Sequence, residues 1–110
     1  MNKLQFKKDD LIFLLNENIK ILNKYSQEYN YHALYNNEIL YHACIRRTNI
    51  ICRLLLLYKQ YNINTFNENE FKYFVELLRL LSDYTKIHFA DVWFFVYKKI
   101  PDIELKLNRK

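Results

Sequence analysis

The chain has 110 residues, of which 51% are hydrophobic and 17% aromatic, and its formal net charge is +5. This hydrophobic content excludes an intrinsically disordered chain, and this length suffices for one small core. Because the sequence contains no glycine, it cannot carry a P-loop or a Rossmann fingerprint, which both need glycine where the backbone approaches a phosphate closely.

The positive charge is spread along the chain, with only a small run near its end at Lys106, Arg109 and Lys110. A net positive charge permits an acidic partner, although a solvated lysine-rich surface is the simpler interpretation. No stretch approaches the roughly 20 apolar residues of a membrane-spanning helix. The N-terminal MNKLQFKKDD also lacks the apolar run of a signal peptide. We therefore expect no association with a membrane.

The first predicted helix covers residues 9–29. Its apolar side chains recur at helical spacing and are Leu11, Leu14, Leu15, Leu22, Tyr25 and Tyr29, with Ile12 and Ile19 alongside. Asp9 and Asp10 are expected to cap its start, where negative charge also complements the helix dipole. The asparagine-rich residues 30–37 are predicted to form a connection.

The second predicted helix, residues 38–61, is the longest and is expected to be the central element, because no Gly or Pro interrupts it. One stripe is mainly apolar and consists of Leu40, Ala43, Arg47, Ile50, Leu54, Leu57 and Tyr61, widened by Cys44, Ile51, Leu55 and Tyr58. The opposite stripe is more polar and consists of His42, Arg46, Asn49, Arg53, Leu56 and Gln60. Residues 50–61 are apolar nearly all round, so we predict that they form the hub of the core.

A third helix is predicted over residues 67–84. Asn67 is its expected N-cap, and Glu68 and Glu70 suit the first turn. The apolar positions that follow at helical spacing are Phe71, Phe74, Val75, Leu78 and Leu81.

The last predicted helix covers residues 87–99. Its aromatic and β-branched residues also favour a strand, but no turn residues separate it from the preceding helix. Pro101 is expected to push Ile100 out of the helical region, and the alternating Ile103–Leu107 could form a short extended segment or begin a further element. The sequence thus predicts one all-α domain, residues 1–110, with three to four helices around a long central helix.

No catalytic or metal-binding constellation is predicted. His88 and Asp91 share a helix face and could supply two metal ligands, whereas a zinc site needs three or four. Cys44 and Cys52, eight residues apart on one helix, would lie about 12 Å apart along its axis, too far for a disulfide. Arg53 could activate the neighbouring Cys52 thiol, but inert burial is the favoured interpretation. We expect neither enzymatic activity nor a cofactor, and the free thiols suit a reducing compartment.

Two sets of residues are predicted to contact another protein. The first is the polar stripe of the central helix: His42, Arg46, Asn49, Arg53 and Leu56. Its arginines suit an interface because their donors are arranged as a fork. The second set is Trp93, Phe94 and Tyr97, because consecutive aromatic residues on a helix cannot all face one core and apolar surface usually marks an interface.

Several runs resemble GINS-complex subunits, of the SLD-five or the PSF-one type. The run Cys52-Arg53-Leu54, followed by Lys59, resembles the arginine-leucine-lysine signature of their long helix. Residues 67–73 resemble the acidic start of the next helix, and residues 98–105 resemble its exit through a proline. The resemblance covers residues 40–105. The interval from residue 70 to residue 101 is about two helical turns longer than the family pattern, and the resemblance includes no counterpart of the small β domain that usually follows in that family.

The resemblance implies a non-catalytic scaffold subunit in the nucleus. Such a subunit would assemble with other protein subunits as a hetero-oligomer in the eukaryotic replicative helicase, and it would meet DNA only indirectly, through that assembly. Two alternatives stay open: a small basic nucleic-acid-binding helical protein, and a lineage-specific subunit of an organellar or ribosomal complex. The cytoplasm is the second location to consider.

Overall fold

The computed structural model describes residues 7–61, 64–83 and 88–109, and every regular element in these ranges is helical. The elements in chain order are α1 (Lys8–Glu28), α2 (Tyr31–Asn36), α3 (Glu38–Tyr58), α4 (Glu68–Leu81), α5 (Phe89–Phe94), the π-helix η1 (Phe95–Lys99) and α6 (Ile100–Leu107). The prediction of an all-α fold is therefore confirmed over these ranges.

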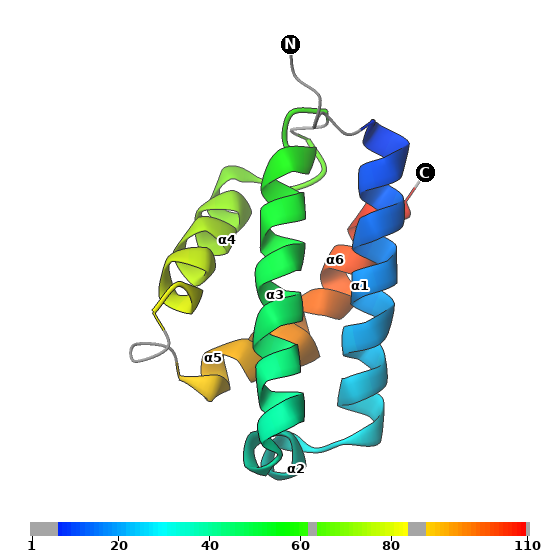
Figure 1. Cartoon of the computed structure of the whole chain (residues 1–110). Coiled ribbons are helices and arrows are strands. Elements are labelled where there is room, and N and C mark those ends of the chain that lie inside the picture. The colour runs from blue at the N-terminus through cyan, green and yellow to red at the C-terminus, as the bar shows by residue number, and fades with distance from the viewer. Residues whose placement is uncertain (1–6, 62–63, 84–87, 110) are drawn as a thin grey trace.

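The other elements are arranged around α3 (Figure 1). α1 and α4 lie on opposite sides of α3 and both pack against it, and α2 packs at its N-terminal end. The segment α5–η1–α6 passes behind α3, where η1 contacts both α3 and α1 and where α6 contacts α1. α3 therefore has neighbours on most of its circumference, and only its front is open to solvent.

The core is built on the inner side of α3. Its fully or nearly fully buried residues on that side are Cys44, Ile45, Thr48, Ile51, Cys52, Leu55 and Tyr58. They meet Leu11, Leu15, Ile19 and Leu22 of α1, Phe71, Phe74, Leu77 and Leu81 of α4, and Phe95, Val96 and Ile100 of the C-terminal segment. The prediction that residues 50–61 are the hub of the core is confirmed for the inner side only. Leu57 is 39% exposed, because four consecutive leucines on a helix point in different directions and cannot all face the core.

The start of α1 differs from the prediction. Helical geometry begins at Lys8, and the N-cap position is Lys7, which makes no side-chain capping bond. Asp9 and Asp10 are therefore inside the first turn, where they complement the dipole but cap nothing.

The predicted connection over residues 30–37 was wrong, because it contains α2. Asn30 caps α2 by accepting a bond of 2.8 Å from the amide of Ala33, and Asn37 caps α3 by accepting one of 3.1 Å from the amide of Leu40. Leu34 between them is fully buried. Two asparagine caps and the burial of Leu34 thus stabilise a helix of six residues that would be too short to form alone.

The prediction that Pro101 ends the helix was also wrong. Ile100 is helical, with φ −59° and ψ −45°, and Pro101 occupies the first turn of α6. η1 provides the reason, because the amide of Ile100 bonds to the carbonyl of Phe95, five residues back. This hydrogen bond spans five residues, as in a π-helix, where an α-helix would span four. It falls immediately before Pro101, which has no N–H to donate, and the chain continues as a helix through the proline.

The predicted extended segment Ile103–Leu107 lies within α6 and is a helix. Ile100, Ile103 and Leu107 follow helical spacing and are buried, whereas Leu105 is 62% exposed. The sequence alternates only because an apolar residue, Leu105, lies on the solvent side of the helix between the buried Ile103 and Leu107. Contact of α6 with α1 and η1 selects the helical set.

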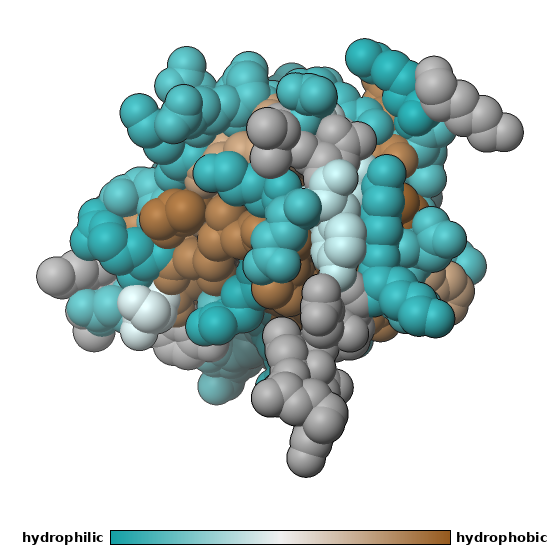
Figure 2. Space-filling model, turned by 90° about the horizontal axis from the view of Figure 1, so that it is seen from above, coloured by the Kyte–Doolittle hydropathy of each residue, from teal (hydrophilic) through white to brown (hydrophobic). Residues whose placement is uncertain are grey.

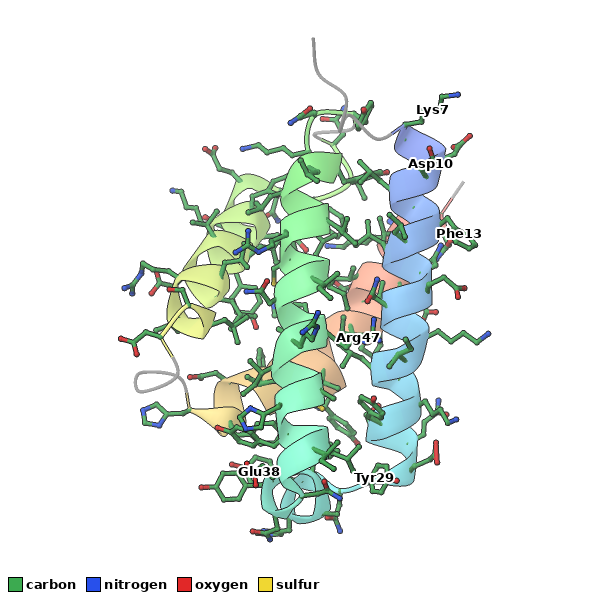
Figure 3. All side chains as sticks on the ribbon, in the orientation of Figure 1. Lys7, Asp10, Phe13, Tyr29, Glu38 and Arg47 are labelled. Carbon is green, nitrogen blue, oxygen red and sulfur yellow. The ribbon has the colours of Figure 1, made fainter. Side chains whose placement is uncertain are left out.

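One buried polar contact joins α1 to α3. Asn18 is only 7% exposed, and its side chain donates to the carbonyl of Leu14 at 2.8 Å. Its amide oxygen accepts a bond of 2.8 Å from Nη1 of Arg47, which lies on the face of α3 next to α1 (Figure 3). Because an unpaired buried amide is costly, this bond favours one register between the two helices.

A second polar contact joins α4 to α6. Asn67 and Glu70 form a reciprocal capping box, with bonds of 2.8 and 2.9 Å. The other carboxylate oxygen of Glu70 accepts a bond of 2.7 Å from Lys106 Nζ, and Lys106 also lies 3.5 Å from Asp102. The start of α4 and the middle of α6 are therefore held by one carboxylate.

The capping box generates a stability prediction. Asn67→Ala should lower the free energy of unfolding by about 1–2 kcal/mol, because the amide of Glu70 loses its acceptor. Thermal unfolding should show a melting temperature lower by roughly 4–8 °C per kcal/mol for a domain of this size. Asn69→Ala, an exposed change in the same first turn, is the matched control and should change little. Equal melting temperatures for the two variants would contradict the capping role.

The Glu70–Lys106 contact generates a prediction about pH. Partial burial opposes ionisation of Glu70. The hydrogen bonds that its carboxylate accepts from Lys106 and from the backbone N–H of Asn67 outweigh this effect and hold the pKa of the carboxyl below its usual value. The folded pKa is thus lower than the unfolded one. The contribution of ionised Glu70 to the free energy of unfolding is therefore complete above the unfolded pKa. It is lost as the pH falls through the folded pKa.

Glu70→Gln removes the charge but keeps the capping box, because the glutamine side chain can still accept a hydrogen bond from the backbone N–H of Asn67. We expect the wild type to lose about 0.5 kcal/mol more stability than this variant between about pH 6 and pH 3, a small value because both partners are partly solvated. Urea unfolding across this range measures the difference. Parallel stability curves for the two proteins would show that the ion pair contributes nothing.

Candidate interaction site

The predicted contact stripe lies on the flank of α3 that faces α4 and solvent. His42, Arg46 and Arg53 are exposed, and Asn49 and Leu56 are half-buried. Nε of Arg53 donates to the Asn49 side chain at 2.8 Å, which aligns the guanidinium along the helix surface. Helical geometry places the five residues along one stripe of α3.

Two hollows lie between this stripe and α4. The first has a volume of about 400 Å³ and is lined by His42, Ile45, Arg46, Asn49, Ile50 and Leu81. The second has a volume of about 350 Å³ and is lined by Leu56, Lys59, Glu68, Phe71, Lys72, Val75 and Glu76. We call the surface formed by these two hollows and Arg53 the α3–α4 groove. Viewed from the end where α3 stops and α4 starts, the molecule shows a hydrophobic area bordered by hydrophilic side chains (Figure 2).

The second predicted set lies on α5 and η1. Phe94 and Tyr97 are 48% and 52% exposed, and Trp93, which is half-buried, stacks on Tyr97 with a centroid distance of 5.4 Å and an interplanar angle of 13°. The ammonium groups of Lys98 and Lys99 lie 5.4 Å from the Tyr97 ring and 5.8 Å from the Phe94 ring. We call Trp93, Phe94 and Tyr97 the aromatic face.

A chain of ring contacts connects the aromatic face to the start of α3. Trp93 contacts Tyr31 of α2 edge-on at 6.0 Å, and Tyr31 contacts Phe89 at 5.6 Å. Phe89 stacks on Tyr41 at 4.8 Å, and Tyr41 contacts the adjacent His42 at 5.3 Å. The two predicted sets are therefore connected through the rings of Tyr31, Phe89 and Tyr41 and do not contact each other directly in these ring pairs. The rest of the α3 stripe lines the α3–α4 groove, whose two hollows include no residue of α5 or η1.

Several residues of these surfaces were not predicted. Lys72, Val75 and Leu81 supply the second wall of the α3–α4 groove, and Tyr31 supports the aromatic face. The spacing of Glu68, Lys72, Val75 and Arg79 on α4 was a usable signal, because these residues share one solvent-facing flank. Tyr31 gave no such signal, since α2 itself was predicted to be a connection.

The groups that could carry chemistry are few in the part of the chain that the structure describes. No cluster of three or more His, Cys, Asp or Glu side chains there could hold a metal ion, and no helix there is long and apolar enough to cross a membrane. Both cysteines are free and buried. Burial raises the pKa of Cys44 to about 11 and raises that of Cys52 still further. The predicted burial of Cys52 is thus confirmed, and its inertness stays a prediction.

Comparisons with known proteins identify no relative of this chain. No family model, no curated protein and no solved structure matches it. The resemblance to GINS subunits therefore stays a prediction.

The burial of the thiols predicts their reactivity. At neutral pH neither Cys44 nor Cys52 should react measurably with a disulfide reagent such as dithionitrobenzoate while the protein is folded, because the nucleophile is the thiolate and burial disfavours it. In denaturant, both thiols should react within the mixing time of a manual assay. Rapid release of one equivalent from the folded protein would show that one cysteine is accessible, and Cys44→Ser would then identify which.

Proposed function

We propose that this chain is a non-catalytic helical subunit that assembles with other protein subunits. The observation that carries the proposal is the aromatic face, where Phe94 and Tyr97 leave about half of each ring in solvent. Rings of this size bury some 150–250 Å² when covered and dominate interface energies. Because α5–η1 already packs Phe95 and Val96 into the core, the outer rings are surplus to folding.

The contact residues of this proposal are the two predicted sets. They are the α3 stripe of His42, Arg46, Asn49, Arg53 and Leu56, and the aromatic face of Trp93, Phe94 and Tyr97. In this proposal, the helices form a bundle around α3, and the α3 stripe and the aromatic face are two separate contact surfaces. Exposed apolar patches bordered by polar side chains are typical of protein interfaces.

The resemblance to GINS subunits supplies a specific form of the proposal. In that form the chain is a scaffold subunit of the GINS assembly in the nucleus, and it meets DNA only through that assembly. The runs at residues 52–59, 67–73 and 98–105 support this form. The competing form of the proposal is that the chain is a subunit of an organellar or ribosomal complex with similar physical properties.

Affinity purification from the native cell tests the proposal. We expect wild-type protein to co-purify with defined partner chains, and we expect Phe94→Ser combined with Tyr97→Ser to reduce their recovery about 10- to 100-fold, as loss of interface anchors does. Recovery of three other small helical subunits together with MCM proteins would identify the GINS form. Recovery of ribosomal or respiratory subunits would identify the competing form.

Phe13→Ser is the matched control, since Phe13 is 63% exposed and points outward from α1 (Figure 3). Its replacement should leave partner recovery unchanged. A wild-type chain that is recovered alone and stays monomeric would refute the proposal. Partners retained equally by the aromatic-face variant would show that the aromatic face is not the contact.

A further inference from the structure

The α3–α4 groove combines an apolar floor with a basic wall on the α3 side. Val75 is 53% exposed, and Ile50 and Leu56 are half-buried. The α3 wall carries the cations Arg46, Arg53 and Lys59, and the α4 wall carries Lys72 between Glu68 and Glu76. We propose that this groove binds one amphipathic α-helix of a partner protein, with apolar anchors on one face and acidic residues flanking them.

The dimensions of the groove fit a helix. From His42 to Lys59 the α3 wall extends roughly 26 Å, which corresponds to a partner helix of about 17 residues. The two hollows are centred near Arg46 and between Leu56 and Lys59, so apolar anchors about 11 residues, or three turns, apart would enter both. Binding of an amphipathic helix in a groove between two helices is a recurrent mode of recognition.

The charge of the α3 wall selects an acidic partner. Glu76 is already paired with Arg79, and no ion pair within residues 7–61, 64–83 and 88–109 involves Arg46, Arg53 or Lys72. The two arginines lie on the α3 wall, so the acidic flank of a bound helix would face α3. An arginine fork binds a carboxylate through two parallel bonds, which orients the bound helix as well as attracting it.

The same features disfavour nucleic acid as the occupant. Nucleic-acid affinity depends mainly on phosphate neutralisation. An apolar floor contributes nothing to phosphate binding, whereas leucine or isoleucine anchors would bury it. This inference rests on the proposed function, since it names the chemistry of one partner segment.

Fluorescence anisotropy with synthetic helical peptides tests the inference. The probe is a labelled peptide of about 17 residues with leucines at the anchor positions and glutamates on both flanks. One comparison peptide has lysines in place of the glutamates, and another has the same composition in a scrambled order. We expect the acidic amphipathic peptide to bind at least about tenfold more tightly than either comparison peptide, equivalent to about 1.4 kcal/mol.

Charge reversal locates the binding site. Arg46→Glu combined with Arg53→Glu should weaken binding of the acidic peptide about tenfold or more. Lys20→Glu combined with Lys24→Glu, the same change of charge at exposed sites on α1, should weaken it far less. Arg46→Gln combined with Arg53→Gln provides a milder change if the reversed variant melts at a lower temperature than the wild type.

Three outcomes would overturn the inference. They are equal binding of the acidic and lysine peptides, equal weakening by the α1 and α3 variants, and tighter binding of a single-stranded oligonucleotide that the Arg46 and Arg53 variants abolish. Its failure is separable from that of the proposed function. Peptides that do not bind would leave the function intact if native partners are still lost with the aromatic-face variant.

Discussion

The structure depends on the burial of one wide face of α3. Seven residues of that face, from Cys44 to Tyr58, are nearly inaccessible to solvent, and α1, α2, α4, α5 and η1 all pack against this helix. A chain of 110 residues has a small core with little area to spare, and α3 is the element that most of the other helices pack against. The remaining elements are positioned by which part of α3 they cover.

Two polar contacts complement this apolar packing. Hydrophobic contact is non-directional, and helices packed by it alone could slide along one another. The bond between Asn18 and Arg47 favours one register of α1 on α3, and the bond between Glu70 and Lys106 ties α6 to the start of α4. Both contacts are long-range in sequence, and each gives a direction to an interface that is otherwise a set of apolar surfaces.

The same arrangement determines which side chains remain for a partner. Because α4 covers only one edge of α3, the stripe with Arg46 and Arg53 stays accessible and becomes one wall of the α3–α4 groove. Because α5–η1 places Phe95 and Val96 inward, helical geometry directs Phe94 and Tyr97 outward. The two candidate surfaces thus follow from the packing of their helices, and the chemistry we propose for each follows from its exposed side chains.

The sequence by itself determined the long elements and their buried sides. Apolar residues at helical spacing predicted α1, α3 and α4 to within a few residues, and Asn67 was recognisable as a cap, because these signals are local. The spacing of Arg46, Asn49 and Arg53 likewise predicted one shared surface. Only the tertiary structure decided that residues 31–36 and 103–107 are helical and that α4 forms the second wall of the groove. The short α2 has too few internal bonds to be stable alone, and α6 continues a helical run across Pro101 that contacts with α1, distant in the chain, stabilise.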